Sequence, residues 1–411
     1  MINNTVLQDN FTGNESTVIS NDSIGVDYIT NKPNTIKGKV LFVTTTDSMI
    51  WHFLQPHIKA MMEDGYIVEC ACSKTGDYFD NIKAALNITV HKLHFSRRPF
   101  KLQNIKAYYE LKKLIKTNHY DILHCHEPVG GALCRLAGHK YCKKIIYTAH
   151  GFHFFSGNSR FNNFLYGSIE RFLALKTDLL ITMNNEDFIA AKNFKLRTND
   201  SMICKINGIG INTAIYSNAS KSQNTIKEQY NILSNKKIIL TVGECISRKN
   251  HITLINALQK IDPVAVLVIC GGGPLLYKLL KTVGVTISDR IIFTGYQSQM
   301  IPFYSEADVF VSSSLQEGLP CSMMEAMASG LPVVASDIRG HVDLIDTNGG
   351  ILLDPNDDDG FANSINTILK DTALAKEMGE HNMEKIKMFD STVVIKEMQQ
   401  LYAKLENVTR I

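Results

Sequence analysis

Short apolar runs alternate with longer amphipathic stretches along most of the chain, starting near Lys37. In the first half, the runs that predict strands are residues 39–44, 67–72, 121–124, 144–148, 178–182 and 203–206. A polar stretch at 207–227, which includes NGIGIN and many Ser and Asn residues, interrupts the pattern. The runs then resume at 237–242, 264–270, 290–293, 308–312, 332–335 and 350–353. Apolar strands separated by helical patterns predict an α/β fold, with helices covering both faces of parallel sheets.

The chain length and the break in the pattern predict two lobes. A chain of 411 residues exceeds one ordinary core, since domains usually contain about 100–200 residues. We therefore expect one doubly wound, Rossmann-like lobe at 36–207 and a second at 208–388, with a cleft between them. Residues 389–411 are expected to form a helix that packs back on the first lobe. Residues 1–35, rich in Asn, Ser and Thr, are expected to form a flexible extension.

Composition excludes several classes of protein. The chain has 43 Lys and Arg against 40 Asp and Glu, whereas a dedicated nucleic-acid binder shows a strong basic excess. The nine cysteines include no CxxC pair, so neither a disulfide framework nor a zinc site is indicated. No apolar run approaches the roughly 18–20 residues of a membrane span, and the N-terminal residues do not have the pattern of a signal peptide. We expect a cytoplasmic protein.

The strongest chemical signal is a pair of carboxylates in the segment DVFVSSSLQEGLPCSMMEAMASGLPVVASD. A buried strand runs into a Ser-rich loop that ends at Glu317, and a short helix that carries Glu325 follows. In doubly wound sheets, ligands bind beyond the carboxyl ends of the strands, where this loop lies. Gly318 lets the backbone approach a ligand, and free N–H groups at the helix start can hold phosphate oxygens. A solvated surface pair is the alternative, but the helix is otherwise apolar.

In this context the chain resembles the family 4 glycosyltransferases, whose signature is Glu, seven residues and a second Glu. The sequence matches it at Glu317, Gly318, Leu319, Pro320 and Glu325. The resemblance implies the GT-B fold, transfer with retention of anomeric configuration, and no cofactor or metal. It also implies that Glu317 faces the donor sugar near its reacting centre. Glu325 would bind the ribose hydroxyls of the nucleotide, and each carboxylate can accept two such hydrogen bonds.

Two other loops that follow strands are expected to bind the donor. Arg248 and Lys249 can neutralise a diphosphate, although such a basic pair is often simply solvated. The family uses a Lys at the position of Lys249, but many members have Arg where this chain has Glu244. The glycine-rich turn that contains Gly272 and Gly273 can approach the nucleotide. Tyr296 stands in the segment that forms the nucleobase pocket in the family, and a packing role is its alternative.

Two histidine-containing segments of the first lobe are candidates for the sugar side of the cleft. In YTAHGFHFF, the resemblance implies that His150 contacts the donor sugar or stabilises charge beside the anomeric carbon. His153 is a weaker candidate for the acceptor side. In HCHEPVGG, His124 and His126 share one side of an extended chain, but a third metal ligand cannot be named. We therefore interpret His126 and Glu127 as residues that line the acceptor side, with Glu127 beginning a turn.

Two charged stretches have structural as well as functional interpretations. The acidic run 357–359 mimics a metal-binding DxD motif, but acidic residues also favour the start of a helix, and we interpret it as a cap. Residues 95–116 contain seven basic side chains with Phe100, Tyr108 and Tyr109. This stretch is either a solvated helix face or a patch that touches anionic lipid, which would hold the protein on the inner face of the cell membrane.

These observations predict an enzyme that moves a sugar from a nucleotide diphosphate donor to a carbohydrate acceptor. The resemblance is closest to bacterial polysaccharide-assembly transferases. It implies a UDP-hexose or UDP-N-acetylhexosamine donor and an acceptor carried on polyprenyl diphosphate. Two other hypotheses remain at this point: a nucleotide-sugar 2-epimerase of the same fold, or a non-catalytic subunit that binds a sugar nucleotide.

Overall fold

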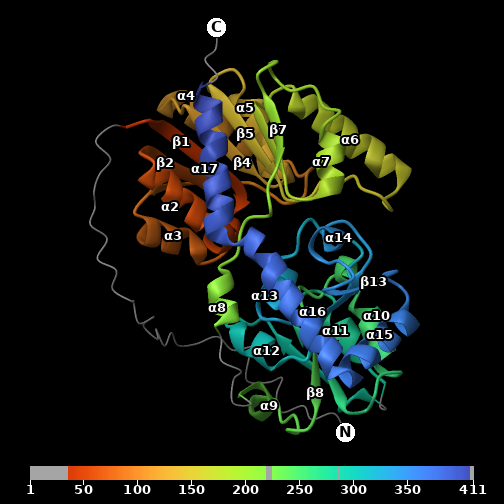
Figure 1. The fold of residues 1–411 in the computed structure, drawn as a ribbon. Helices are drawn as coiled ribbons and strands as arrows, with labels where there is room; N and C mark the ends of the chain where they lie inside the picture. Colours follow the sequence, from red (N-terminus) through yellow and green to blue (C-terminus); the bar gives the residue numbers. More distant parts are fainter. Residues whose placement is uncertain (1–35, 219–224, 285–286, 408–411) are drawn as a thin grey trace.

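The computed structural model describes residues 36–218, 225–284 and 287–407. The extension expected at 1–35 lies outside these residues. The chain forms two α/β lobes, drawn one above the other in Figure 1, and helix α17 (Ser391–Asn407) runs along the upper, N-terminal lobe. The α/β class and the two doubly wound lobes of the GT-B fold are confirmed.

The N-terminal lobe is built on a seven-stranded parallel sheet with the order β3-β2-β1-β4-β5-β6-β7. Its strands are β1 (Gly38–Thr46), β2 (Tyr66–Ser73), β3 (Thr89–Lys92), β4 (Ile122–His126), β5 (Lys144–Ala149), β6 (Leu179–Thr182) and β7 (Met202–Lys205). The six predicted strands of this half are all present, with ends within about two residues. The sequence pattern missed β3, because this edge strand has four residues, of which only Val90 is buried.

The C-terminal lobe contains a six-stranded parallel sheet with the order β10-β9-β8-β11-β12-β13. Its strands are β8 (Lys237–Val242), β9 (Ala265–Cys270), β10 (Ile291–Gly295), β11 (Val309–Ser312), β12 (Val333–Ser336) and β13 (Gly350–Leu353). All six match the predicted runs, and β9 is buried along its whole length. A strand that is covered on both faces needs no polar alternation, which explains its continuous apolar sequence AVLVIC.

Helices cover both faces of each sheet. Those of the N-terminal lobe are α1 (Asp47–Met49), the π-helix η2 (Ile50–Leu54), α2 (Gln55–Glu63), α3 (Tyr78–Leu86), α4 (Gln103–Asn118), α5 (Pro128–Gly138), α6 (Arg160–Ala174) and α7 (Asn185–Ala191). The remaining helices are α8 (Thr213–Ser217), α9 (Thr225–Gln229), the 3-10 helix η3 (Ser247–Lys249), α10 (His251–Leu258), α11 (Leu276–Thr282), α12 (Ile301–Glu306), α13 (Cys321–Ala328), α14 (His341–Leu344), α15 (Asp358–Lys370), α16 (Thr372–Lys385), the 3-10 helix η5 (Ile386–Phe389) and α17.

The last described helix, α17, packs against the N-terminal lobe, although the preceding helices belong to the C-terminal lobe. Its buried side chains join the apolar core on the face of the first sheet that α2 and α3 also cover: Val394, Met398, Leu401, Tyr402 and Leu405. The opposite face of that sheet is covered by α4, α5 and α6, whose buried residues form a second core. The C-terminal lobe has two corresponding cores.

The polar stretch predicted as a linker contains two short helices, α8 and α9, in its described part. Two contacts tie it to the chain segment before α17, since Thr213 N and Oγ1 both donate to the carboxylate of Asp390 at 3.1 and 2.7 Å. Gly210 has a φ of +82° and packs against the backbone of Ser391. The two chain segments that pass between the lobes, one before α8 and one before α17, therefore lie side by side.

Candidate active site

Glu317 is buried at the carboxyl end of the second sheet and is held by two basic side chains. Its Oε1 lies 2.7 Å from Lys249 Nζ and accepts a 2.8 Å hydrogen bond from Ser314 Oγ, while its Oε2 lies 3.2 Å from Arg248. Burial alone would raise the pKa of this carboxyl. The positive charges of Lys249 and Arg248 outweigh that effect and lower its pKa to about 2, so Glu317 is ionised at neutral pH.

The loop after β8 holds Lys249 against the sheet. A Cβ on Gly243 would lie 2.9 Å from Lys249 Cε, so this glycine leaves room for the lysine stem. The 2.7 Å hydrogen bond from Leu315 N to Arg248 O joins this loop to the Glu317 loop. The structure thus brings together Arg248, Lys249 and Glu317, which the sequence had placed in two separate segments.

A 480 Å³ pocket opens beside this ion pair. It is lined by residues that follow β8, β9 and β10, among them Glu244, Gly272, Gly273, Tyr296 and Gln297. The glycines of the turn differ in what they do: Gly273 is needed because a Cβ would lie 2.8 Å from Cys245 O, whereas a Cβ on Gly272 would meet only Tyr296 N at 3.9 Å. Tyr296 is 68% exposed, so it has the freedom to stack on a ligand that a packed core residue would not have.

Glu325 occupies a different environment, on helix α13. Its Oε2 accepts a 2.7 Å hydrogen bond from Tyr304, and Tyr216 lies close enough to contribute a second one. Burial raises the pKa of Glu325, and the hydrogen bonds from Tyr304 and Tyr216 only partly oppose it. Its partners are neutral, in contrast to those of Glu317. The helix itself, Cys321–Ala328, agrees with the predicted one, and Pro320 stands directly before it.

The two lobes meet where the Glu317 loop touches the loop after β5. A Cβ on Gly318 would lie 1.7 Å from His150 O, so only glycine allows this approach. Gly318 O accepts a 3.2 Å hydrogen bond from Asn184 of the N-terminal lobe. Leu319 packs beside Gly208 and belongs to the cores of both lobes. Gly318 is therefore required by contact between the lobes, which the sequence pattern had assigned to ligand approach.

Arg339 is a residue at this junction that the sequence analysis missed. It is almost completely buried, and its guanidinium lies 2.7 Å from the carboxylate of Asp187 in the N-terminal lobe. It also donates to Phe152 O at 3.1 Å and to Glu317 O at 3.0 Å. The signal was available, since Arg339 lies three residues after β12, at the carboxyl end of the strand. It borders an 840 Å³ cleft whose walls come from both lobes and which also contains Arg248 and Glu317.

His150 lies at the same junction and contacts His126. The two rings are joined by a 3.1 Å contact between His150 Nε2 and His126 Nδ1. Burial lowers the pKa of His150 to about 4 and that of His126 well below its ordinary value. Both are neutral at pH 7, so each ring has one N–H donor and one bare nitrogen. His126 Nε2 is buried and has no hydrogen-bond partner among the described residues.

The neighbouring His124, unlike His126, has a hydrogen-bond partner for each of its ring nitrogens. Its Nδ1 lies 2.5 Å from Tyr402 OH of α17, and its Nε2 lies 2.8 Å from Thr148 Oγ1. Both ring nitrogens therefore have partners within the fold. No group of three or more His, Cys, Asp or Glu side chains in the described residues is arranged to hold a metal ion.

Glu127 stands at the end of β4 in a strained conformation, with a φ of +61°. Glu127 is a turn residue, as the sequence interpretation has it, and Pro128 follows as the first residue of α5, a position where proline costs no hydrogen bond. The Glu127 carboxylate accepts a 2.7 Å hydrogen bond from Thr45 N at the end of β1. Burial raises its pKa. His153 lies further along the β5 loop, where its ring is 5.3 Å from that of Tyr166 in α6.

The acidic run 357–359 is confirmed as a helix cap. Asp357 Oδ1 accepts a 2.8 Å hydrogen bond from Gly360 N at the start of α15. Asp358 and Asp359 form ion pairs with Lys260 at 3.0 and 2.6 Å. These carboxylates have structural partners, as first-turn acids of a helix commonly do.

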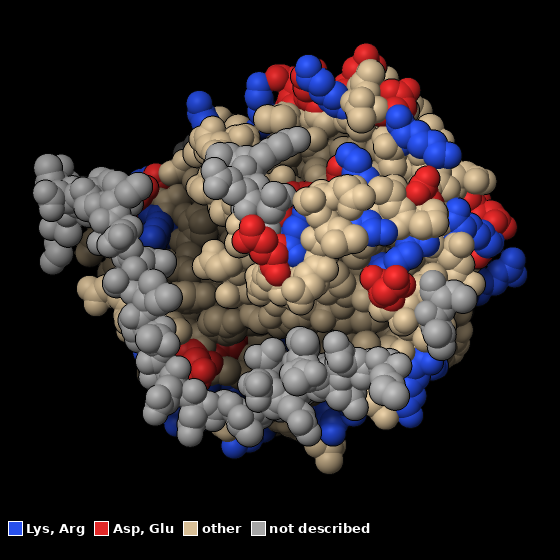
Figure 2. Space-filling view, turned by 90° about the horizontal axis from the view of Figure 1, so that it is seen from below, with Lys and Arg blue, Asp and Glu red and all other residues tan. Residues whose placement is uncertain are grey.

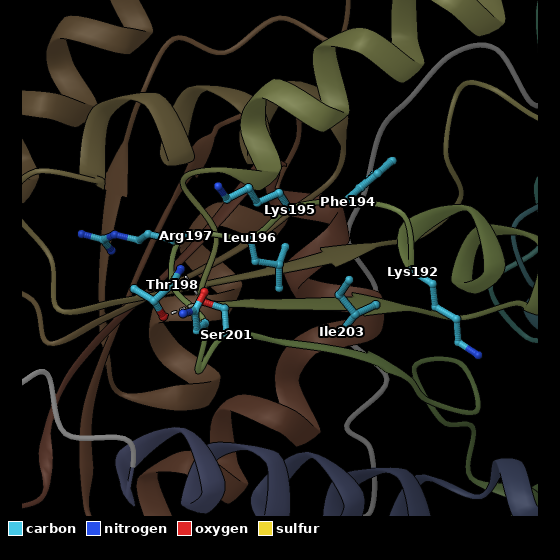
Figure 3. A pocket seen from close by; sticks show the side chains of 9 residues that line it. Lys192, Phe194, Lys195, Leu196, Arg197, Thr198, Ser201 and Ile203 are labelled. Atoms are coloured by element: carbon cyan, nitrogen blue, oxygen red, sulfur yellow. Dashed lines mark hydrogen bonds between the residues drawn. The ribbon is translucent and has the colours of Figure 1, made fainter.

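A further hollow, of 310 Å³, lies in the loop before β7 and so at the amino ends of the strands, away from the cleft. It contains Lys192, Lys195 and Arg197, but their side chains point in different directions and do not converge (Figure 3). Arg197 is occupied by an ion pair with Asp178 at 3.0 Å. This hollow therefore lacks the converging cations of an anion site.

Comparison with known proteins agrees with the geometry. The model for glycosyl transferases group 1 matches residues 222–385, and the model for glycosyl transferase 4-like proteins matches residues 39–184. EpsD of Bacillus subtilis, which carries a glycosyltransferase name, is 34% identical over 377 residues that cover 89% of this chain and 96% of EpsD.

Two further proteins extend the comparison. The UDP-Gal:alpha-D-GlcNAc-diphosphoundecaprenol alpha-1,3-galactosyltransferase of Escherichia coli is 27% identical over 320 residues, which cover 75% of this chain and 81% of that enzyme. The crystal structure of Anabaena HepE in complex with UDP superposes with a TM-score of 0.72 at 17% identity, over 89% of this chain and 99% of HepE. At that identity the likeness shows the fold alone.

Proposed function

The chain is a family 4 glycosyltransferase with the GT-B fold, and we propose that it transfers a hexose or an N-acetylhexosamine from a UDP donor to a lipid-linked carbohydrate in surface polysaccharide synthesis. The observation that carries the proposal is the junction of the lobes. There Lys249, Arg248 and Glu317 of one lobe lie beside the loop that holds His150 of the other.

The donor occupies the C-terminal lobe in this proposal. Its base and ribose enter the pocket beside Gly272, Gly273 and Tyr296, and its diphosphate faces Lys249 and Arg248. Two cations suit this position, because the leaving diphosphate gains negative charge as the sugar departs. They supply that charge compensation without a metal ion. The UDP named for HepE and for the Escherichia coli relative supports UDP as the nucleotide.

The two carboxylates of the signature have separate roles. Glu325, whose partners are neutral hydroxyl groups, binds the ribose hydroxyls. Glu317 orients the donor sugar, and Gly318, Leu319 and Pro320 border it. Glu317 is not the nucleophile, because both its oxygens are engaged by Lys249, Arg248 and Ser314 and its pKa is about 2. A fully engaged carboxylate of such low pKa is weakly nucleophilic.

The transfer retains the configuration of the anomeric carbon. The acceptor hydroxyl attacks from the face that the diphosphate leaves: its C–O bond forms as the bond to the phosphate oxygen breaks. The acceptor proton passes to that phosphate oxygen. His150, neutral at pH 7, donates a hydrogen bond to the donor sugar beside the reacting carbon. His126, Glu127 and His153 lie on the acceptor side.

The acceptor is a sugar carried on polyprenyl diphosphate. The printed name of the Escherichia coli relative, which specifies a diphosphoundecaprenol substrate, supports this part of the proposal. No helix of the described residues is long and apolar enough to cross a bilayer. The basic stretch 97–116 provides contact with an anionic membrane surface instead. Its exposed cations are Arg97, Arg98, Lys101, Lys106, Lys113 and Lys116.

In this proposal the lobes span 36–207 and 208–388, and the helix of the C-terminal segment packs on the first lobe; the positions of β7, β8 and α17 support these limits. The epimerase alternative is not favoured, because the matched family models and relatives carry transferase names. A non-catalytic subunit would not need a strained Glu127 and a neutral histidine at the lobe junction.

Product analysis tests this function. The purified chain is incubated with radiolabelled UDP-sugars and a sugar on polyprenyl diphosphate. We expect label in the lipid fraction, with the new linkage in the same anomeric form as the donor. Isomerised free donor without transfer would indicate an epimerase. Saturable UDP binding without turnover of any donor would indicate a binding subunit.

A further inference from the structure

Helix α6 exposes an apolar side that no other part of the described chain covers. Phe161 and Phe164 are each 72% exposed, Phe172 is 54% exposed and Leu175 at the C-cap is 44% exposed. Apolar side chains scattered singly on a surface need no explanation, but a contiguous group marks an interaction site. These four residues, which we name the α6 face, occupy about a quarter of the helix circumference at 3.6 residues per turn.

The fold holds the opposite side of α6 firmly, so the α6 face is not the product of a loose helix. Ser159 caps the helix by accepting a hydrogen bond from Asn162 N. On the inner side, Glu170 forms a bidentate pair with the fully buried Arg135, at 2.8 and 3.3 Å. The Arg135 guanidinium lies 3.7 Å from the ring centre of Tyr147. Helix α6 therefore presents its outer side in a fixed orientation.

The charged side chains of residues 160–176 that flank the α6 face are all positive. By helical period, Arg160 and Arg171 flank it on one side and Lys176 on the other, with Lys176 Nζ 4.1 Å from the ring centre of Phe172. The one acid within α6, Glu170, is buried in its ion pair. By contrast, basic and acidic side chains are interspersed on the face of the molecule in Figure 2.

The exposed aromatic side chains and the flanking cations together favour one binding partner for the α6 face. A two-fold contact between copies of the chain would bring the same three cations of each copy together, with no exposed α6 acid to pair them. An anionic lipid surface complements both features, since aromatic side chains enter the headgroup layer and each nearby cation contributes about 1 kcal/mol. We propose that the α6 face inserts into the headgroup layer of an anionic membrane.

The position of α6 gives this insertion a consequence for the active site. The helix begins directly after the loop that carries His150, at the cleft end of the N-terminal lobe (Figure 1). It lies in the same helical layer as α4, which begins beside the exposed Phe100 and Leu102, 80% and 81% exposed. Insertion of the α6 face thus turns the acceptor side of the cleft to the membrane. This consequence rests on the proposed function, whereas the lipid binding itself does not.

The test uses the full chain with the triple variant Phe161→Ser, Phe164→Ser and Phe172→Ser. A matched control, Tyr277→Ser with Leu233→Ser, removes side chains of similar exposure from the C-terminal lobe, 68% and 66%. Flotation is measured with vesicles of phosphatidylglycerol and of phosphatidylcholine, without any donor sugar. We expect wild type and control to bind phosphatidylglycerol vesicles, and the triple variant to bind more than about tenfold more weakly.

A second variant, Arg160→Glu with Lys176→Glu, tests the contribution of the cations and keeps every aromatic ring. It should also weaken vesicle binding and reduce the salt dependence of that binding. UDP affinity and melting temperature should stay within error in all variants. Equal binding by the triple variant and the control would overturn the proposal. So would a wild type that is dimeric by light scattering and becomes monomeric in the triple variant, because a second copy would then cover the α6 face. A wild type that binds phosphatidylglycerol vesicles through the α6 face but transfers no sugar would instead count against the proposed function alone.

Discussion

Glu317 and Glu325 stand eight residues apart, yet the fold places them in opposite electrostatic environments. Glu317 lies in a loop between two lobes and is paired with Lys249 and Arg248, which hold its pKa at about 2. Glu325 lies on α13 and is hydrogen-bonded to tyrosine hydroxyls, and burial raises its pKa. Both are acceptors for hydroxyl groups, but only Glu317 is tied to charges that a diphosphate would also attract.

This difference teaches that the pair is one motif in sequence but two sites in space. Glu317 neutralises the cations proposed to receive the diphosphate. In the proposed function, the charge of Glu317 therefore opposes nucleotide binding, while the same carboxylate orients the sugar. Glu325 has no such conflict, because its neighbours are uncharged. Substitution of the two residues should consequently move nucleotide affinity in opposite directions.

The largest expected effect is that of Lys249→Ala, which removes the ion pair between Lys249 and Glu317. This change leaves the buried Glu317 with only Arg248 and Ser314, and loss of one partner of a buried pair costs about 3–5 kcal/mol. Transfer should fall below detection and the midpoint of urea unfolding should drop. Arg248→Ala is the control, because Arg248 is 44% exposed and exposed pairs contribute about 1 kcal/mol or less. Equal losses of stability in the two variants would contradict the assignment of Lys249 as the buried partner.

The next effect separates the two carboxylates directly. Glu325→Gln should weaken UDP binding by roughly 1–3 kcal/mol, because a hydrogen bond to a charged acceptor is lost. Glu317→Gln should lower turnover by about 100-fold while UDP binding stays equal or becomes tighter, since Lys249 and Arg248 are released. Calorimetry with UDP and initial rates under saturating donor measure both. Weaker UDP binding in Glu317→Gln than in Glu325→Gln would reverse the roles.

A smaller effect follows from the buried histidines near Glu317. Burial lowers the pKa of His150 and of His341 to about 4, below the ordinary 6.5, so the unfolded chain binds protons first as the pH falls. Stability is therefore complete above about pH 6.5 and decreases toward pH 4, by on the order of 2 kcal/mol per histidine between pH 7.5 and 5. Glu317 remains ionised over this range, and the raised pKa of Glu325 acts in the opposite sense. Urea titrations of wild type and His150→Asn test this, and an unchanged pH slope in the variant would show that His150 does not contribute.

The smallest expected effect is that of removing divalent metal. Because Lys249 and Arg248 supply the positive charge in the proposed mechanism, EDTA should leave the rate of transfer within about twofold. Asp357→Asn should also leave it unchanged, since this residue caps α15 through its side-chain oxygen. Strict dependence on added Mn²⁺ or Mg²⁺, lost in Asp357→Asn, would restore the acidic run as a metal site.

Most of the fold was accessible from the sequence, and the exceptions have identifiable causes. Twelve of the thirteen strands were predicted, because strands covered on both faces are apolar along their length. The missed β3 is an edge strand with one buried residue. The candidate site was predicted less completely. Arg248, Lys249 and Glu317 were named, but Arg339 and Asp187 were not. Arg339 stands near a strand end as the named residues do, but its 2.7 Å contact with Asp187 joins segments 152 residues apart.

The sequence by itself determined the two α/β lobes, the strand ends that carry the candidate site, and the family signature at Glu317 and Glu325, since periodicity and local motifs are properties of neighbouring residues. Only the tertiary structure decided which charges meet. It paired Lys249 with Glu317, surrounded Glu325 with tyrosines, and made Gly318 necessary for contact with His150. It also left the aromatic side of α6 uncovered. The physical reason is that burial and pairing, which set the pKa values and the exposed surface, depend on segments that become neighbours only when the two sheets and the returning α17 are assembled.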